Sequence, residues 1–202
     1  MKLRSVILWT IAVLASGSLA HAAQITIQFD ELTTRPADNV TVGGVTFGFT
    51  VGGVPSLDAT YNFALGMPGL AYASDPVLEG TTAGTLALVF AVPTSFLRLS
   101  GLLAGVDPLD PGFSVQLYDA NLQSMGTIPV AVSPVVSLSE AQFTYNSTAI
   151  RRAELTFSSA APRFAIDNVT YTVPDVPEPG TLWMILSGGL FIALGCARRR
   201  RR

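Results

Sequence analysis

Alternating apolar and polar residues predict β-strands along most of the chain. Ile25, Ile27 and Phe29 alternate with polar residues, and the segments 45–51 and 113–118 repeat this pattern. A period of two sends successive side chains to opposite faces of a strand, so each of these segments is able to bury one face. Further short strands are predicted at 61–65, 70–73, 86–92, 96–103, 122–128, 143–145, 150–157 and 164–173.

Turn-forming residues separate these segments, and helical patterns are almost absent. Gly, Pro, Asn and Asp cluster between the predicted strands; Pro93 is expected to end one strand, and segment 137–142 to form one turn of helix at most. Many short strands with regular turns are typical of all-β domains. We therefore predict an all-β fold, an antiparallel β-sandwich that is jelly-roll-like, with a β-barrel as the alternative.

The last predicted strand, 164–173, changes parity in its middle. Phe164 and Ile166 point one way, whereas Val169 and the apolar residues after it have the opposite parity. One face buries both sets only if an extra residue interrupts the strand, which predicts a β-bulge near Asp167-Asn168.

Three carboxylates are candidates for a calcium site. The first and last strands of such sandwiches often lie side by side, so Asp167 is expected near Asp30 and Glu31, which follow the first strand. Carboxylates with backbone carbonyls at a strand end suit Ca²⁺, which takes six to eight oxygen ligands at roughly 2.3–2.6 Å. The alternative is that Asp167 and Asn168 bond the backbone of a neighbouring loop, as Asx residues commonly do.

The chain begins with a segment that resembles an export signal. Lys2 and Arg4 precede the apolar run 6–15, and Ala20-His21-Ala22 provides an A-x-A ending. This pattern predicts a secretory signal peptide, cut after Ala22, and hence export through the Sec machinery.

The chain ends with a second apolar run. Residues 181–197 are apolar over about 17 positions, the lower limit for a membrane-spanning helix. An unbroken basic block follows and is expected to stay in the cytoplasm; it consists of Arg198, Arg199, Arg200, Arg201 and Arg202. The predicted organisation is a signal peptide (1–22), a β-sandwich domain (23–173), a Pro-rich linker (174–180), and a membrane helix with its arginine tail (181–202).

The tail resembles the PEP-CTERM sorting signal of exopolysaccharide-producing Gram-negative bacteria. Pro177-Glu178-Pro179 comes first, then the apolar run, then the arginines, in the order of that signal. The resemblance implies recognition by an exosortase, a membrane transpeptidase that cuts near the motif, with Pro177, Glu178 and Pro179 as the signal residues. A plain C-terminal anchor is the alternative. The segment 164–169 also resembles the closing strand of many PEP-CTERM sandwiches and of some carbohydrate-binding jelly rolls, which often hold a structural calcium.

Composition excludes several kinds of function for the middle of the chain. Twelve acidic side chains and five arginines lie between Gln24 and Val173, a net charge of −7. Nucleic-acid binders need a basic face, so we expect no nucleic-acid partner. The same stretch has no His, Cys or Lys, which excludes Ser-His and Cys-His catalysis, the common zinc sites and lysine Schiff bases.

Three hypotheses of function follow. The first is a non-enzymatic protein of the cell surface or extracellular matrix, associated with exopolysaccharide or biofilm; the matrix association comes from the family resemblance. The second is a carbohydrate-binding module, for which Tyr61, Tyr72, Tyr118 and Tyr145 are the candidate stacking platforms. The third is a glycosidase that uses two carboxylates, which is the enzyme chemistry that the composition leaves open.

Overall fold

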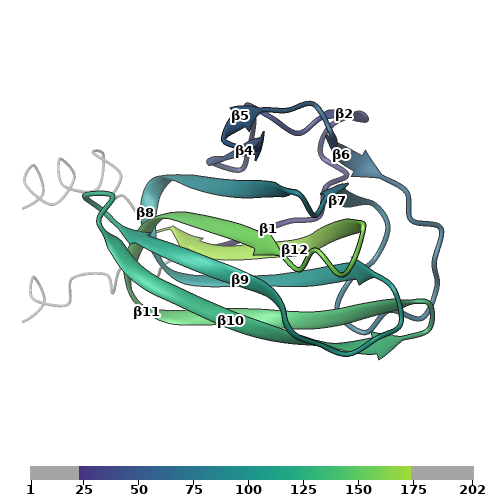
Figure 1. Cartoon of the computed structure of the whole chain (residues 1–202). Coiled ribbons are helices and arrows are strands. Elements are labelled where there is room, and N and C mark those ends of the chain that lie inside the picture. The colour runs from purple at the N-terminus through teal and green to yellow at the C-terminus, as the bar shows by residue number, and fades with distance from the viewer. Residues whose placement is uncertain (1–22, 174–202) are drawn as a thin grey trace, which may run out of the picture. The chain divides into compact units, whose positions relative to one another are not determined.

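Twelve β-strands and no helix make up residues 23–173, the part of the chain that the computed structural model describes (Figure 1). The strands are β1 (Ala23–Ile27), β2 (Arg35–Pro36), β3 (Val40–Val42), β4 (Val45–Val51), β5 (Val54–Pro55), β6 (Ala59–Phe63), β7 (Val77–Thr81), β8 (Gly84–Ala104), β9 (Leu109–Asp119), β10 (Ser124–Val135), β11 (Leu138–Phe157) and β12 (Arg163–Val173). Every strand pair is antiparallel. The expected signal peptide, linker, membrane helix and arginine tail lie outside these residues. Within residues 23–173, no helix is long and apolar enough to cross a membrane.

Two long strands, β8 and β11, contribute to both layers of the structure. The first layer has the order β10-β9-β11-β8-β4, with β3 and β5 beyond β4, and uses residues 84–90 of β8. The second layer has the order β11-β8-β12, with β1 and β7 along the far edge of β12, and uses residues 94–104 of β8. β6 and β2 extend this layer beyond β7. The expected all-β, antiparallel, jelly-roll-like sandwich is confirmed.

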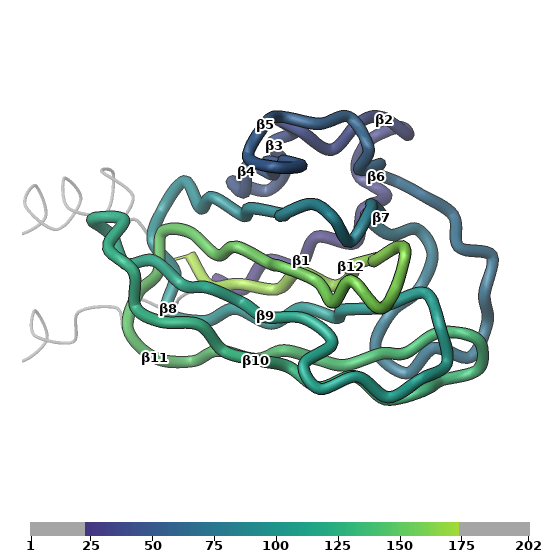
Figure 2. Tube along the Cα trace, in the orientation of Figure 1, coloured from purple at the N-terminus to yellow at the C-terminus, as the bar shows by residue number. Residues whose placement is uncertain are grey.

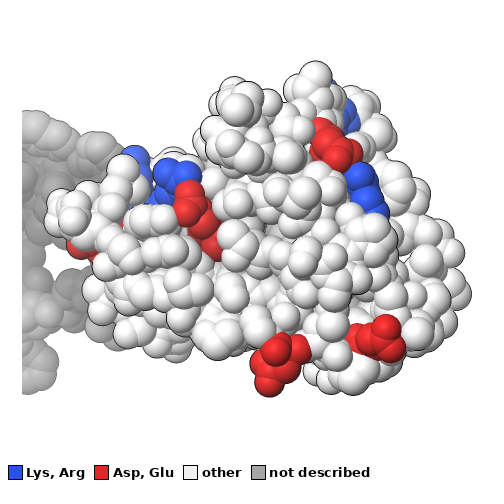
Figure 3. Space-filling view, viewed as in Figure 1, with Lys and Arg blue, Asp and Glu red and all other residues white. Residues whose placement is uncertain are grey.

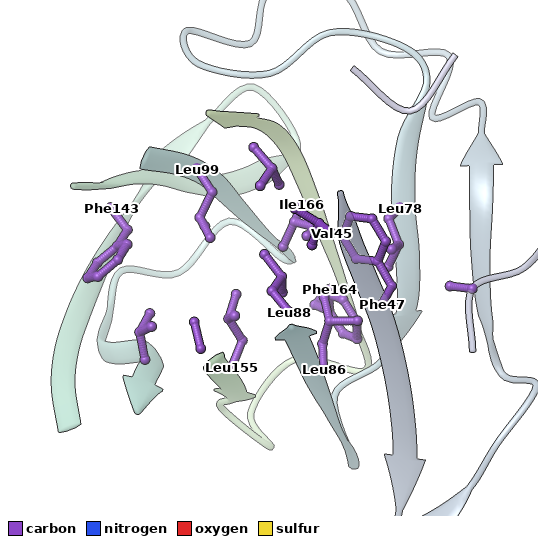
Figure 4. Packing of buried hydrophobic residues seen from close by; sticks show 14 of the residues in the cluster. Val45, Phe47, Leu78, Leu86, Leu88, Leu99, Phe143, Leu155, Phe164 and Ile166 are labelled. Carbon is purple, nitrogen blue, oxygen red and sulfur yellow. The ribbon is translucent and has the colours of Figure 1, made fainter. Parts of the chain in front are cut away.

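Apolar side chains from the two layers meet in one core (Figure 4). Phe49 of the first layer packs on Phe164 of the second, with ring centroids 5.9 Å apart, and Phe90 packs on Tyr171 at 5.4 Å. Large aromatic side chains bury the most apolar area per residue. These rings therefore supply much of the hydrophobic stabilisation between the layers.

β8 differs from its sequence prediction because it does not end at Pro93. The inward-facing residues have even numbers up to Phe90 and odd numbers from Leu97 onward, and Ala91 and Val92 between them are exposed. The strand thus passes from one layer to the other at this point while keeping its extended backbone. One further expectation was wrong, since residues 70–73 form no strand. Segment 137–142, where one turn of helix at most was expected, has no helix, and β11 begins there at Leu138.

The predicted bulge and the pairing of the chain's first and last strands are both confirmed. The register between β12 and β8 shifts between Asp167 and Thr170, and Asn168 has a φ of 53°. β1 pairs with β12 from Ala23 opposite Val173 to Ile27 opposite Val169, so the chain enters and leaves the domain at adjacent residues (Figure 2).

Gly101 permits the close approach of the two layers. A Cβ at Gly101 would lie 2.5 Å from the ring of Phe113, which is itself buried. We expect Gly101→Ala to lower the free energy of unfolding by about 1–3 kcal/mol, because the new Cβ would overlap the buried ring of Phe113. Chemical denaturation of the purified protein measures the effect.

Gly48 provides the matched control. It also lies within a strand, but its Cβ would meet nothing closer than 3.9 Å. Gly48→Ala should leave stability unchanged or raise it by up to about 1 kcal/mol. Equal losses in the two variants would contradict the proposed packing of the layers.

Candidate functional site

A long connection between β6 and β7, residues 64–76, covers the outer face of the second layer. Leu65, Met67, Leu70 and Ala73 of this connection pack against a second buried cluster, separate from the main core. That cluster consists of Val77, Leu102, Leu138 and Ala165. The connection therefore removes from water an apolar sheet face that would otherwise be exposed.

Carboxylates satisfy the main-chain N–H groups of this connection. Glu140 on β11 is buried and accepts hydrogen bonds from the N–H groups of Ala71 and Tyr72, at 2.9 and 2.8 Å. Asp75 accepts two more, from Leu65 and Gly66, both at 2.7 Å. Hydrogen bonds to ionised acceptors are stronger than neutral ones, so these carboxylates hold an irregular segment in one conformation.

Asp167 holds the same connection from the bulge of β12. Its fully buried carboxylate accepts hydrogen bonds from the N–H of Ser74 at 2.8 Å and from that of Asn168 at 2.6 Å. The side-chain amide of Asn168 donates to the carbonyl of Tyr72 at 2.8 Å. The alternative from the sequence, that these two residues bond the backbone of a neighbouring loop, is confirmed.

Burial raises the pKa of Asp167 from 3.8 to about 6. Desolvation is the main cause; the hydrogen bonds from Ser74 and Asn168 oppose it, and the charge of Glu31 adds to it. Loss of water disfavours the charged form of a carboxyl group, so Asp167 holds its proton to a higher pH in the folded chain.

The residues predicted to bind calcium approach each other only in part. Glu31 lies near enough for its charge to raise the pKa of Asp167, but its own oxygens accept hydrogen bonds from the N–H of Gln28 and the hydroxyl of Tyr61. Asp30 is exposed. Within residues 23–173, no three His, Cys, Asp or Glu side chains are grouped to hold a metal ion. Calcium binding by Asp30, Glu31 and Asp167 stays a prediction.

A pocket of about 180 Å³ opens beside the connection, on the outer face of the second layer. Its lining is mostly apolar and includes Phe63, Met67, Leu102, Ala104 and Ala165. Its polar groups come from Glu79 and Arg163.

An ion network forms the polar side of this pocket. Arg163 donates from Nε and Nη2 to the two oxygens of Glu79, and from Nη1 to Asp58 at 2.9 Å. Glu79 is buried, which fixes the geometry of the pair. The sequence did not single out Phe63, Glu79 or Arg163, because residues of β6, β7 and β12 meet here only in the folded chain.

The candidate sugar-stacking tyrosines differ in their exposure. Tyr61 is fully buried in the core, whereas Tyr72 is 46% exposed. Tyr118 donates to Glu154 at 2.6 Å, and Tyr145 to the carbonyl of Thr148 at 2.8 Å. Of these four, Tyr72 is the most exposed.

Comparison with known proteins identifies the tail that follows this domain. Residues 175–202 match the family model of the PEP-CTERM protein-sorting motif. The chain therefore joins a β-sandwich to a PEP-CTERM sorting signal, as its sequence predicts. Pro177, Glu178, Pro179 and the arginines 198–202 lie within the matched segment and outside the residues that the structure describes. No curated protein sequence is significantly similar to the chain.

Solved structures with remote similarity include carbohydrate-binding modules. The tandem CBM22-1-CBM22-2 domain of Paenibacillus barcinonensis Xyn10C is 18% identical, with a TM-score of 0.38; the match covers 81% of this chain and 49% of that one. A family 29 carbohydrate-binding module is 10% identical, with a TM-score of 0.38 and coverage of 79% and 99%. The active domain of bacteriophage CBA120 tailspike protein 4 is 12% identical, with a TM-score of 0.38 and coverage of 68% and 22%. Similarities this remote carry no argument about a ligand.

Asp167 makes stability depend on pH. Because its pKa is higher in the folded chain than in the unfolded chain, its contribution to stability is fully present below about pH 4 and is lost as the pH rises to about 6. Asp167→Asn should remove this dependence and lower the free energy of unfolding by about 1–3 kcal/mol, because an amide has one acceptor oxygen for the two N–H donors that the buried carboxylate accepts. Denaturation at several pH values between 4 and 7 measures both effects.

Asp119→Asn is the control for the lost hydrogen bond. Asp119 also accepts two main-chain N–H groups, those of Asn121 and Gln123, but at an exposed turn where water replaces a lost acceptor. We expect a cost below about 1 kcal/mol. A pH profile that Asp167→Asn leaves unchanged would show that Asp167 is not the titrating group.

The calcium prediction is tested by removal of the ion. If Asp30, Glu31 and Asp167 bind Ca²⁺, EGTA lowers the melting temperature and Asp167→Ala abolishes the difference, because bound ligand stabilises the folded state. Equal melting temperatures with EGTA and with added calcium would reject the site.

Proposed function

We propose that the chain is an exported, non-enzymatic protein of the cell surface or extracellular matrix, associated with exopolysaccharide. The observation that carries this proposal is the PEP-CTERM protein-sorting motif at residues 175–202, which begins two residues after β12 ends at Val173. The motif implies export and a membrane-anchored sorting signal. Under this proposal the Sec machinery exports the chain, the tail holds it in the membrane, and an exosortase then processes it for the surface or the medium.

The state of the buried carboxylates supports a non-enzymatic role. A glycosidase needs two carboxyl groups that face its substrate, one of which gives up a proton. Glu79 is paired with Arg163, while Glu140 and Asp167 bond the main chain of the 64–76 connection. A carboxylate-based glycosidase is therefore the weaker alternative.

A second candidate function is carbohydrate binding. The pocket beside residues 64–76 combines an apolar lining with the partly exposed ring of Phe63 and the ion pair of Glu79 and Arg163. Apolar lining with a few oriented polar groups is the usual composition of a small-ligand site.

The first experiment is the intact mass of the protein recovered from its native host, with membrane and medium fractions measured separately. We expect a product that starts near Ala23 and ends close to Pro177–Pro179, because export removes the first segment and the exosortase cuts at the motif. A Glu178→Ala variant serves as the control and should keep its tail. A mass that runs through Arg202 in both fractions would make this a membrane-tethered domain and remove the main support for a matrix role.

A further inference from the structure

The backbone before Phe63 is arranged in an unusual way. In β6, Tyr61 and Asn62 together lie opposite the single residue Leu78 of β7, because the register shifts between Thr60 and Phe63. Asn62 has a φ of 59°, a left-handed conformation that few side chains adopt. A β-bulge changes the face to which the following side chain points.

The bulge changes the face of the sheet to which the side chain of Phe63 points. Simple alternation after the buried Tyr61 would turn Phe63 into the core, but the ring is 37% exposed and lies opposite Val77, whose side chain belongs to the outer-face cluster. Phe63 therefore forms one wall of the pocket on that face. Left-handed non-glycine residues often mark functional positions, because the conformation costs about 1–3 kcal/mol and needs support.

Hydrogen bonds on both sides supply that support. The side-chain amide of Asn62 donates to the carbonyl of Leu32 at 2.6 Å, and the hydroxyl of Thr34 donates to the carbonyl of Asn62 at 3.0 Å. The backbone that carries Phe63 is thus held in place before any ligand arrives, which lowers the ordering cost of binding.

The other walls define the size of the ligand. Ala104 and Ala165 have small side chains and leave space on the sheet face, and Leu102 and Leu138 form the apolar floor. A volume of about 180 Å³ is below the range of roughly 300–1,000 Å³ that drug-sized ligands occupy. The pocket therefore admits a group of about one ring.

The polar side of the pocket defines the chemistry of the ligand. Arg163 offers N–H donors and Glu79 offers acceptor oxygens in fixed positions, which suits a ring with hydroxyl groups at its edge. Asp58, Glu79 and Arg163 together carry a charge of −1. Figure 3 shows few Lys, Arg, Asp or Glu side chains on the face that it presents. Since residues 24–173 carry a net charge of −7, an anionic ligand would be repelled.

We propose that this pocket is a subsite for one neutral sugar ring of a polysaccharide, with Phe63 against the ring face and the Glu79–Arg163 pair at its hydroxyl groups. A pyranose presents C–H groups on its faces and hydroxyls at its edge, which matches the apolar wall and the polar side of the pocket. This inference rests on the proposed association with exopolysaccharide and assigns that association to a site.

The test uses three variants of the protein purified from its native host. Phe63→Ala removes the aromatic wall, Ala104→Phe fills the pocket without removing a contact, and Ile128→Ala removes an equally exposed apolar side chain outside the pocket lining. Affinity electrophoresis in gels that contain the neutral or the acidic fraction of the host's exopolysaccharide measures binding. Melting temperatures establish that each variant is folded.

We expect the parent to bind the neutral fraction, Phe63→Ala and Ala104→Phe to weaken that binding at least tenfold, and Ile128→Ala to match the parent within twofold. A parent that binds while both pocket variants bind equally well overturns the subsite and leaves the exopolysaccharide association intact. Preference for the acidic fraction also overturns the subsite. If the parent binds neither fraction, the subsite and the proposed association both fail, whatever the mass of the processed product.

Discussion

The architecture depends on strands that belong to two layers at once. β8 contributes residues 84–90 to the first layer and residues 94–104 to the second, and β11 passes between the layers in the same way. A one-residue slip in either half would turn every side chain of that half to the opposite face. Because the halves are covalently continuous, the register chosen in one layer restricts the register in the other. The change of parity between Phe90 and Leu97 is the local adjustment that allows both halves to point into one core.

The cover over the second layer follows from this arrangement. Once the odd-numbered residues of β8 face the core, Leu102 faces outward beside Leu138 and Ala165 and needs a partner. The 64–76 connection supplies that partner without forming a strand of its own, so its N–H groups have no ladder to join. Buried main-chain donors need acceptors, and Glu140 and Asp167, which project from the same face, provide them. The raised pKa of Asp167 shows that the hydrogen bonds offset only part of the desolvation of this carboxyl group.

Patterns within a few neighbouring residues of the sequence predicted the bulge in β12 and the hydrogen bonds of its Asx residues. The parity change in 164–173 predicted the bulge at Asp167, and Asx chemistry predicted that Asp167 and Asn168 bond a loop. The same reasoning failed at Pro93, because a strand that passes between layers leaves an exposed segment where proline is tolerated. It also missed Glu140 and Phe63. Glu140 acts on a segment about seventy residues earlier, and no local pattern reveals such a contact.

Two left-handed asparagines, Asn62 and Asn168, each lie at a β-bulge but differ in what the bulge does to the neighbouring residues. Asn62 and Asn168 are both left-handed, both lie at bulges, and both donate their side-chain amides to a main-chain carbonyl, of Leu32 and of Tyr72 respectively. At Asn168 the bulge lies beneath the 64–76 connection, and the hydrogen bond holds that cover in place. At Asn62 the bulge turns an aromatic ring from the core toward solvent, which forgoes hydrophobic burial. Stability alone explains the first arrangement. The second forgoes burial and forms a pocket wall, which is the arrangement that the proposed sugar subsite requires.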